Sequence, residues 1–160
     1  MTTIAYKDGF VVADCQETLG GVAYKSAPKI VTTNQGMIVA SAGQVDQVQL
    51  ALEFFNRPDW KEKLNESPTF KKGYEAIIFP DGVPYYCYLN CVPVPLGNPF
   101  YAIGSGWQLA WSAMALGQSA EDAVKFAGRL NIHTSEEVQV VNVKATQTKT
   151  NQKRPRRTVG

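Results

Sequence analysis

Alternating apolar and polar residues predict a β-hairpin over the first fourteen positions. Residues Thr2 to Lys7 are rich in the β-branched and aromatic side chains that favour a strand. Asp8-Gly9 is typical of a two-residue type I′ turn, and residues Phe10 to Asp14 return as a second strand. A chain end normally frays unless pairing holds it, so this pattern predicts that Thr2 lies at the mouth of a sheet.

The next third of the chain predicts two strands and a helix. The polar segment 16–27 contains Gly20-Gly21, and we expect it to lack regular structure. Strands are predicted over 29–32 and 37–42, and the second is apolar enough to be buried on both faces. Apolar residues recur every three or four positions over 44–56, which predicts an amphipathic helix. Its expected inward-facing residues are Val45, Val48, Leu52 and Phe55.

The second half predicts more strands and two helices. Residues 57–73 are charged, contain two prolines and leave room only for a short helix over 60–65. Ser119 followed by Asp122 is a helix start similar to a capping box, and Val124, Ala127 and Leu130 are expected to face inward from this helix. The other predicted elements are strands over 75–79, 84–89, 100–103 and 139–143, an extended edge segment or loop over 90–99, and a helix over 107–116.

This order of elements predicts an α+β fold. The helices are too few to alternate with the strands, so a parallel sheet with helical crossovers is disfavoured. Two layers of sheet covered by helices fit the order better. Periodicity alone does not specify how these layers stack.

Composition indicates one globular domain. The chain has 160 residues, of which 44% are hydrophobic and 19% charged, enough to bury a core. No apolar run approaches the roughly 20 residues that a membrane span requires, and no basic-then-apolar signal peptide is expected at the start. Three cysteines, Cys15, Cys87 and Cys91, are an odd number without zinc spacing. They favour a reduced, cytoplasmic setting in which the thiols act as small core hydrophobes.

Charge is unevenly distributed along the chain. Six of the 16 basic residues and none of the acidic residues lie from Lys144 onward, so the remainder is mildly acidic. We therefore expect a folded domain over 1–143 and a basic, disordered tail over 144–160. A solvated end is the simpler interpretation of this tail, and contact with nucleic acid or an acidic partner is the alternative.

The second residue offers a possible nucleophile. Removal of Met1 would free the α-amine of Thr2, whose pKa near ~8 lets it act as a base without histidine. His133 is the only histidine, and its place just after a predicted helix favours a structural role. The sequence contains no glycine-rich phosphate loop.

The order of several short motifs resembles a known family. T-T-I at residues 2–4 is followed by D-G-x-V-V-A-D-x-Q-x-T-L-G, then by K-I, by A-G and later by A-I-G-S-G. The whole resembles the HslV-type peptidases, which are bacterial relatives of the proteasome β subunits and N-terminal nucleophile hydrolases. The likeness covers residues 2–55 and 100–138, is weak over 56–99 and is absent from the tail. It implies the four-layer αββα sandwich of these hydrolases.

The resemblance also implies catalytic roles for five residues. Thr2 would be the nucleophile, Lys29 the cation that promotes its ionisation, and Asp14 the partner that orients Lys29. Gly43 would donate its backbone N–H to the oxyanion, and Ser105 would hydrogen-bond near the amine of the nucleophile. The loop between Asp14 and Lys29 and the spacing after Gly43 are each one residue shorter than in the family.

Ligands and partners follow from the same resemblance. No cofactor is required, although a monovalent cation, Na⁺ or K⁺, would bind the backbone carbonyls of Gly128, Asn131 and Thr134. Asn131 replaces a cysteine more usual in the family. The chain would form a homo-oligomeric ring that cleaves polypeptides beside an ATP-dependent unfoldase. The shortened segment 57–73 departs from the family where a long helix helps to pack subunits.

Each of these residues also has a simpler interpretation. Thr2 could be an ordinary strand residue, Asp14 and Lys29 a plain ion pair at a strand end, and Gly43 and Ser105 a turn and a cap. The sequence therefore leaves two functions open. The first is a threonine peptidase, and the second is a non-catalytic homologue that serves as a structural or interaction module.

Overall fold

The N-terminal hairpin lies at the centre of a four-stranded antiparallel sheet. In the computed structural model, which describes residues 2–19, 22–25, 27–131 and 134–144, the strand order in this sheet is β10-β1-β2-β11. Its strands are β1 (Thr3–Lys7), β2 (Phe10–Asp14), β10 (Phe100–Gly104) and β11 (Val138–Asn142). Asp8 and Gly9 have φ angles of 53° and 82°, the two positive values that a type I′ turn requires. The predicted hairpin is therefore confirmed.

A second antiparallel sheet contains five strands in the order β5-β6-β7-β8-β9. These strands are β5 (Ile30–Thr32), β6 (Ile38–Ala42), β7 (Glu75–Phe79), β8 (Tyr85–Tyr88) and β9 (Val94–Pro95). All five residues of β6 are buried, as the apolar run at 37–42 predicts. The two-residue β9 is the edge strand expected within the proline-rich segment 90–99.

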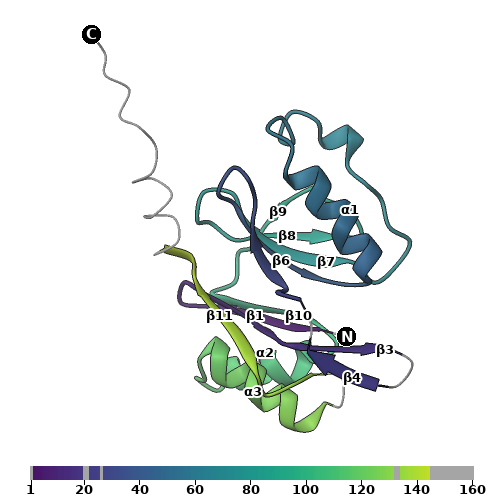
Figure 1. The fold of residues 1–160 in the computed structure, drawn as a ribbon. Coiled ribbons are helices and arrows are strands. Elements are labelled where there is room, and N and C mark those ends of the chain that lie inside the picture. The colour runs from purple at the N-terminus through teal and green to yellow at the C-terminus, as the bar shows by residue number, and fades with distance from the viewer. Residues whose placement is uncertain (1, 20–21, 26, 132–133, 145–160) are drawn as a thin grey trace.

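Three helices cover the outer faces of the two sheets. Helix α1 (Val45–Phe55) lies on the five-stranded sheet, whereas α2 (Trp107–Ala115) and α3 (Ala120–Leu130) lie on the four-stranded sheet (Figure 1). The order of layers is helix, sheet, sheet, helices, which confirms the expected αββα sandwich. No helix within the described part of the chain is both long enough and apolar enough to cross a membrane.

Alternation along each strand divides the core into three apolar clusters. On β7, Ile77 and Phe79 face the other sheet, whereas Ala76 and Ile78 face α1. The third cluster lies between the four-stranded sheet and helices α2 and α3. Because successive strand residues point to opposite faces, each sheet contributes to two of these clusters.

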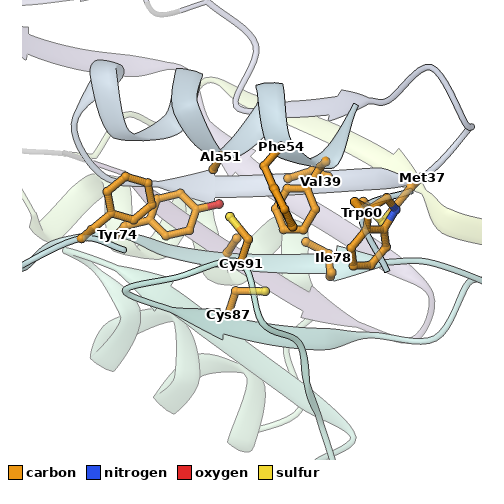
Figure 2. Close-up of a cluster of buried hydrophobic side chains, with 12 residues drawn as sticks. Met37, Val39, Ala51, Phe54, Trp60, Tyr74, Ile78, Cys87 and Cys91 are labelled. Atoms are coloured by element: carbon orange, nitrogen blue, oxygen red, sulfur yellow. The ribbon is translucent and has the colours of Figure 1, made fainter. Parts of the chain in front are cut away.

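The cluster beneath α1 contains two of the three cysteines (Figure 2). Cys87 and Cys91 are fully buried beside Tyr74, and burial raises the pKa of Cys91 to about 12. All three cysteines are free thiols. Cys87 and Cys91 therefore act as core hydrophobes, as their spacing predicts.

Several predicted details were wrong. Segment 16–27 is not irregular, because β3 (Gln16–Leu19) and β4 (Val22–Lys25) pair as a separate hairpin. Gln16 opposes Lys25 across the two strands and Val22 is exposed, so polar and exposed residues take part in this pairing. Gly20 and Gly21, which fall between the two strands in the sequence, lie outside the described residues.

The predicted helix over 60–65 is also absent from the described structure. Turns and a short 3₁₀ helix, η1 (Leu64–Glu66), take its place, and Trp60 is buried under α1 through an edge contact with Phe55. Val45 and Leu130 were expected to face inward, but they are 67% and 62% exposed. Each is the terminal residue of its helix, where the apolar face has already left the sheet.

Candidate active site

Thr2 lies immediately before β1, at the end of the four-stranded sheet where β10 ends at Gly104. Its side chain is buried, and its carbonyl oxygen accepts a 2.7 Å hydrogen bond from the backbone N–H of Ser105. Gly104 makes this approach possible, since a Cβ there would overlap the Thr2 carbonyl oxygen and its φ is +89°. The Gly104-Ser105 turn is therefore fitted directly against the peptide that follows the proposed nucleophile.

Asp14 ends β2 and turns its carboxylate toward the same peptide. Its Oδ1 accepts a 2.8 Å hydrogen bond from the Thr3 N–H, and Oδ2 accepts one of 3.1 Å from the Gln16 N–H. The Ser135 N–H lies 3.4 Å from Oδ2. A carboxylate that is 1% exposed needs such donors, and here the backbone supplies them.

Lys29 completes a buried ion pair with Asp14. Its Nζ lies 3.0 Å from Asp14 Oδ1 and 2.5 Å from the Gln16 carbonyl oxygen, and its side chain is 5% exposed. Burial lowers the pKa of Lys29 below its ordinary value, and the neighbouring Asp14 carboxylate opposes this shift. One oxygen of Asp14 thus joins the ammonium of Lys29 to the Thr2–Thr3 peptide.

Ser105 connects Thr2 to Asn131, the residue that follows α3. Its Oγ lies 3.5 Å from the Thr2 carbonyl oxygen, and its own carbonyl accepts a 3.2 Å hydrogen bond from Asn131 Nδ2. Ser105 therefore lies beside the carbonyl of Thr2. The hydrogen bond near the Thr2 amine, which the resemblance implies, stays a prediction.

Gly43 lies between β6 and the start of α1, at the same end of the sheets. Its φ is +147°, and an added Cβ would lie 2.9 Å from the Gly73 carbonyl oxygen. The preceding residue, Ala42, pairs with Glu75, whose carboxylate bonds the N–H of Gly104. Gly43 is exposed and lies close to the positive end of the α1 dipole.

The three residues of the expected cation site surround the end of α3. Gly128 lies against the backbone of Ser135, since a Cβ there would be 2.4 Å from the Ser135 carbonyl oxygen. The carbonyl oxygen of Asn131 accepts a hydrogen bond from the Thr134 N–H. The described residues include no cluster of three acidic, cysteine or histidine side chains suited to a metal. The monovalent cation bound by backbone carbonyls stays a prediction. Met1 and His133 lie outside the described residues.

Sequence reasoning missed three residues that organise the site. Thr3 Oγ1 accepts a 3.0 Å hydrogen bond from the Gly106 N–H and lies 2.7 Å from Thr134 Oγ1, so the second threonine of the pair has its own structural role. Glu75 and Gln139 each bond the backbone of the opposite sheet. A carboxylate that alternates with Ile77 and Phe79 in one strand was an available signal for Glu75.

No protein-family model matches this chain, and no curated protein sequence is significantly similar to it. Solved structures do resemble it. Eukaryotic HslV from Trypanosoma brucei superposes with a TM-score of 0.66 and 22% identity, covering 87% of this chain and 97% of that one. BPH from Thiobacillus denitrificans in complex with epoxomicin superposes with a TM-score of 0.65 and 18% identity, and the match covers 88% of this chain and 96% of that one. A second structure of BPH superposes with a TM-score of 0.65 and 19% identity, and the match covers 88% of this chain and 95% of that one. The chain therefore has the four-layer αββα fold of the N-terminal nucleophile hydrolases, the fold that HslV and BPH share.

Proposed function

We propose that this chain is a threonine peptidase whose nucleophile is Thr2, freed by removal of Met1. The observation that carries the proposal is the shared oxygen of Asp14, which binds both the Lys29 ammonium and the N–H of Thr3. An ordinary surface ion pair would not connect a buried cation to the peptide of the nucleophile residue. We expect the Lys29 ammonium, held in this way, to favour formation of a Thr2 alkoxide.

Acylation would proceed with the α-amine of Thr2 as the general base. The amine takes the proton of Thr2 Oγ while Oγ attacks the carbonyl carbon of the scissile peptide. The carbonyl π electrons move to oxygen and give a tetrahedral oxyanion. The C–N bond then breaks, and the α-ammonium returns its proton to the departing amine. The products are a threonyl ester and a new peptide N-terminus.

Surrounding residues would stabilise the charges that form in this step. The Lys29 ammonium favours ionisation of Oγ and disfavours protonation of the nearby amine. The backbone N–H of Gly43 donates to the oxyanion, in line with the α1 dipole. Ser105 fixes the Thr2 carbonyl through its own N–H, which sets the orientation of the nucleophile.

Deacylation would repeat the sequence with water. The α-amine takes a proton from water, the hydroxide oxygen attacks the ester carbon, and the ester C–O bond breaks as Oγ recovers the proton. Each residue ends in the state in which it began. No cofactor is required, and a monovalent cation on the carbonyls of Gly128, Asn131 and Thr134 would only brace the loop beside Thr3.

Assembly and partners extend the same proposal. We infer a homo-oligomeric ring in the cytoplasm that encloses Thr2, beside an ATP-dependent unfoldase that delivers polypeptides. The resemblance to HslV-type peptidases supports this, and the short segment 57–73 makes subunit packing the part to test first. The basic residues of the tail over 144–160 would stay solvated or contact nucleic acid.

Two measurements test the catalytic proposal. Intact-mass spectrometry reports whether Met1 has been removed. A peptide epoxyketone is then applied, because its ketone and epoxide together need a hydroxyl and a free amine on one residue. We expect one label per wild-type chain, none on Thr2→Ala, and full labelling of the control Thr32→Ala, which removes an exposed threonine from β5. A demethionylated wild type that takes no label would contradict the peptidase and favour a non-catalytic structural module.

A further inference from the structure

Glu75 is a carboxylate placed at the interface between the two sheets. It begins β7, and the strand alternation puts it on the same face as Ile77 and Phe79, which are completely buried between the sheets. Glu75 itself is half-buried. A charged group in this position is costly unless donors satisfy it, so its partners indicate why it is there.

Two donors from different layers bind this carboxylate. The Tyr86 hydroxyl on β8 of the same sheet donates to Oε1 over 2.8 Å. The backbone N–H of Gly104, at the end of β10 in the other sheet, donates to Oε2 over 3.1 Å. Burial raises the pKa of Tyr86, and the bond to Glu75 raises it further, so this hydroxyl keeps its proton and remains a donor. Glu75 therefore bridges the two sheets.

The bridge ends at the turn that holds Thr2. Gly104 is followed by Ser105, whose N–H binds the Thr2 carbonyl oxygen, and the approach leaves no room for a Cβ at Gly104. Apolar contacts between stacked sheets do not by themselves fix such a turn in direction or register, because they are non-directional. A charge-assisted hydrogen bond does so, since it is short and has a preferred geometry.

We propose that Glu75 is a positioning residue that holds the Gly104-Ser105 turn of one sheet against Thr2 by anchoring it to the other sheet. This role extends the proposed threonine peptidase function, and any effect of Glu75 on the labelling rate rests on that function. Within the described part of the chain, the hydrogen bonds of Glu75 join it to Tyr86 and Gly104 rather than to Thr2. Its effect passes through the Gly104 N–H and the Ser105 N–H to the carbonyl of the nucleophile residue.

Three variants distinguish the hydrogen bond from Glu75 to Gly104 from the charge of Glu75 and from its bond to Tyr86. Glu75→Ala removes the acceptor of the Gly104 N–H. Glu75→Gln keeps an oxygen acceptor of the same length without the charge, and Tyr86→Phe removes only the second donor. The matched control is Ile77→Val, which removes one buried methylene-sized group from the same face of the same strand without touching Gly104.

The first measurement is hydrogen exchange of the full chain, read from peptides covering residues 100–106. It depends on the bridge and not on peptidase activity. We expect exchange in these peptides to be at least about tenfold faster in Glu75→Ala, close to wild type in Glu75→Gln, and unchanged in Ile77→Val. Unchanged exchange in Glu75→Ala would overturn the proposal, even if the wild type never reacts with an epoxyketone.

The second measurement is the epoxyketone labelling rate at saturating and at low probe concentration. We expect Glu75→Ala to lower the maximal rate between about tenfold and a hundredfold with little change in half-saturation, Tyr86→Phe to lower it less, and Glu75→Gln to restore most of it. If the wild type labels and Glu75→Ala labels equally fast, or Ile77→Val is slowed as much, the positioning role is wrong. A wild type that does not label contradicts the peptidase instead, and the exchange result then decides on Glu75 alone.

Discussion

Lys29 and Asp14 form an ion pair that is closed off from solvent, with Nζ 3.0 Å from Oδ1 and the two side chains 5% and 0% exposed. The desolvation of two charges is repaid only when further hydrogen bonds complete both groups. Here Asp14 also accepts from three backbone N–H groups, and Lys29 donates to the Gln16 carbonyl. The pair is therefore built into the fold, whatever its role in catalysis.

Breaking this pair on one side should be costly. We expect Lys29→Met to lower the free energy of unfolding by about 3–5 kcal/mol, because it leaves the Asp14 carboxylate buried without its cation. The double variant Lys29→Met with Asp14→Asn should recover part of this loss, since the amide oxygen still accepts from Thr3 while no charge remains. Urea denaturation measures both. Neither variant should take the epoxyketone label.

The exposed pair between Lys25 and Glu137 is the matched control. Its atoms are 2.6 Å apart, closer than in the buried pair, yet its side chains are 70% and 60% exposed. We expect Lys25→Met to leave both the urea midpoint and the labelling rate unchanged, because water screens this pair. A loss equal to that of Lys29→Met would mean that burial is not what distinguishes the two.

The lowered pKa of Lys29 predicts how its contribution depends on pH. The folded chain holds this proton less tightly than the unfolded chain, whose lysine keeps the ordinary pKa of 10.5. From the folded pKa up to 10.5 the unfolded state therefore binds more protons, and the free energy of unfolding from Lys29 rises with pH. Below that window the contribution is constant and unfavourable.

Urea titrations of wild type and Lys29→Met at several pH values test this sign. The difference in unfolding free energy, wild type minus variant, should increase as the pH approaches 10.5. Both proteins carry Cys15→Ser, because the charges of Cys15 and Lys29 act on each other. Taking the difference then removes the other groups that the two proteins share. A difference that decreases over the same range would mean that attraction to Asp14 outweighs burial and raises the pKa of Lys29.

Gly43 should tolerate no side chain. We expect Gly43→Ala to destabilise the fold by about 1–3 kcal/mol, because its φ of +147° and the Gly73 carbonyl oxygen 2.9 Å from the new Cβ both oppose alanine. Labelling should fall with it, since the shifted N–H no longer faces the oxyanion. Gly97→Ala is the control, as nothing lies within 4 Å of its Cβ position. Equal thermal stability and equal labelling of Gly43→Ala and Gly97→Ala would contradict the role assigned to Gly43.

Gln139 should matter for Lys29 although the two do not touch. Its amide donates to the Ile30 carbonyl over 2.8 Å and accepts from the Ile30 N–H over 3.2 Å, which fixes the start of β5 directly after Lys29. Gln139→Leu leaves both backbone groups unpaired, and we expect a loss of about 1–3 kcal/mol in urea together with slower labelling. Gln49→Leu, on the exposed face of α1, should change neither. A Gln139→Leu variant that labels as fast as wild type would show that Gln139 does not support the site.

Local signals predicted the hairpin and much of the core. Asp8-Gly9 favours a type I′ turn because both residues readily take positive φ. The short apolar run ending at Ala42, bounded by Gly36 and Gly43, favours a buried strand. The same signals failed for Gln16 to Lys25, where polar residues such as Gln16 and Lys25 and the exposed Val22 lie in paired strands. They also failed at Trp60, whose burial under α1 is settled by packing rather than by helical spacing.

The sequence by itself determined the α+β fold class, because turn chemistry and strand alternation are local properties of the chain. The stacking of the layers and the residues of the proposed reaction came instead from the resemblance of its motifs to a known family. Only the tertiary structure decided which groups support these residues. Thr3 and Thr134 form a hydrogen-bonded pair, and Glu75 and Gln139 each bind the backbone of the opposite sheet. These contacts join residues from 29 to 131 positions apart in the sequence. Hydrogen bonds of that separation depend on how two sheets stack, and no periodicity along one strand contains that information.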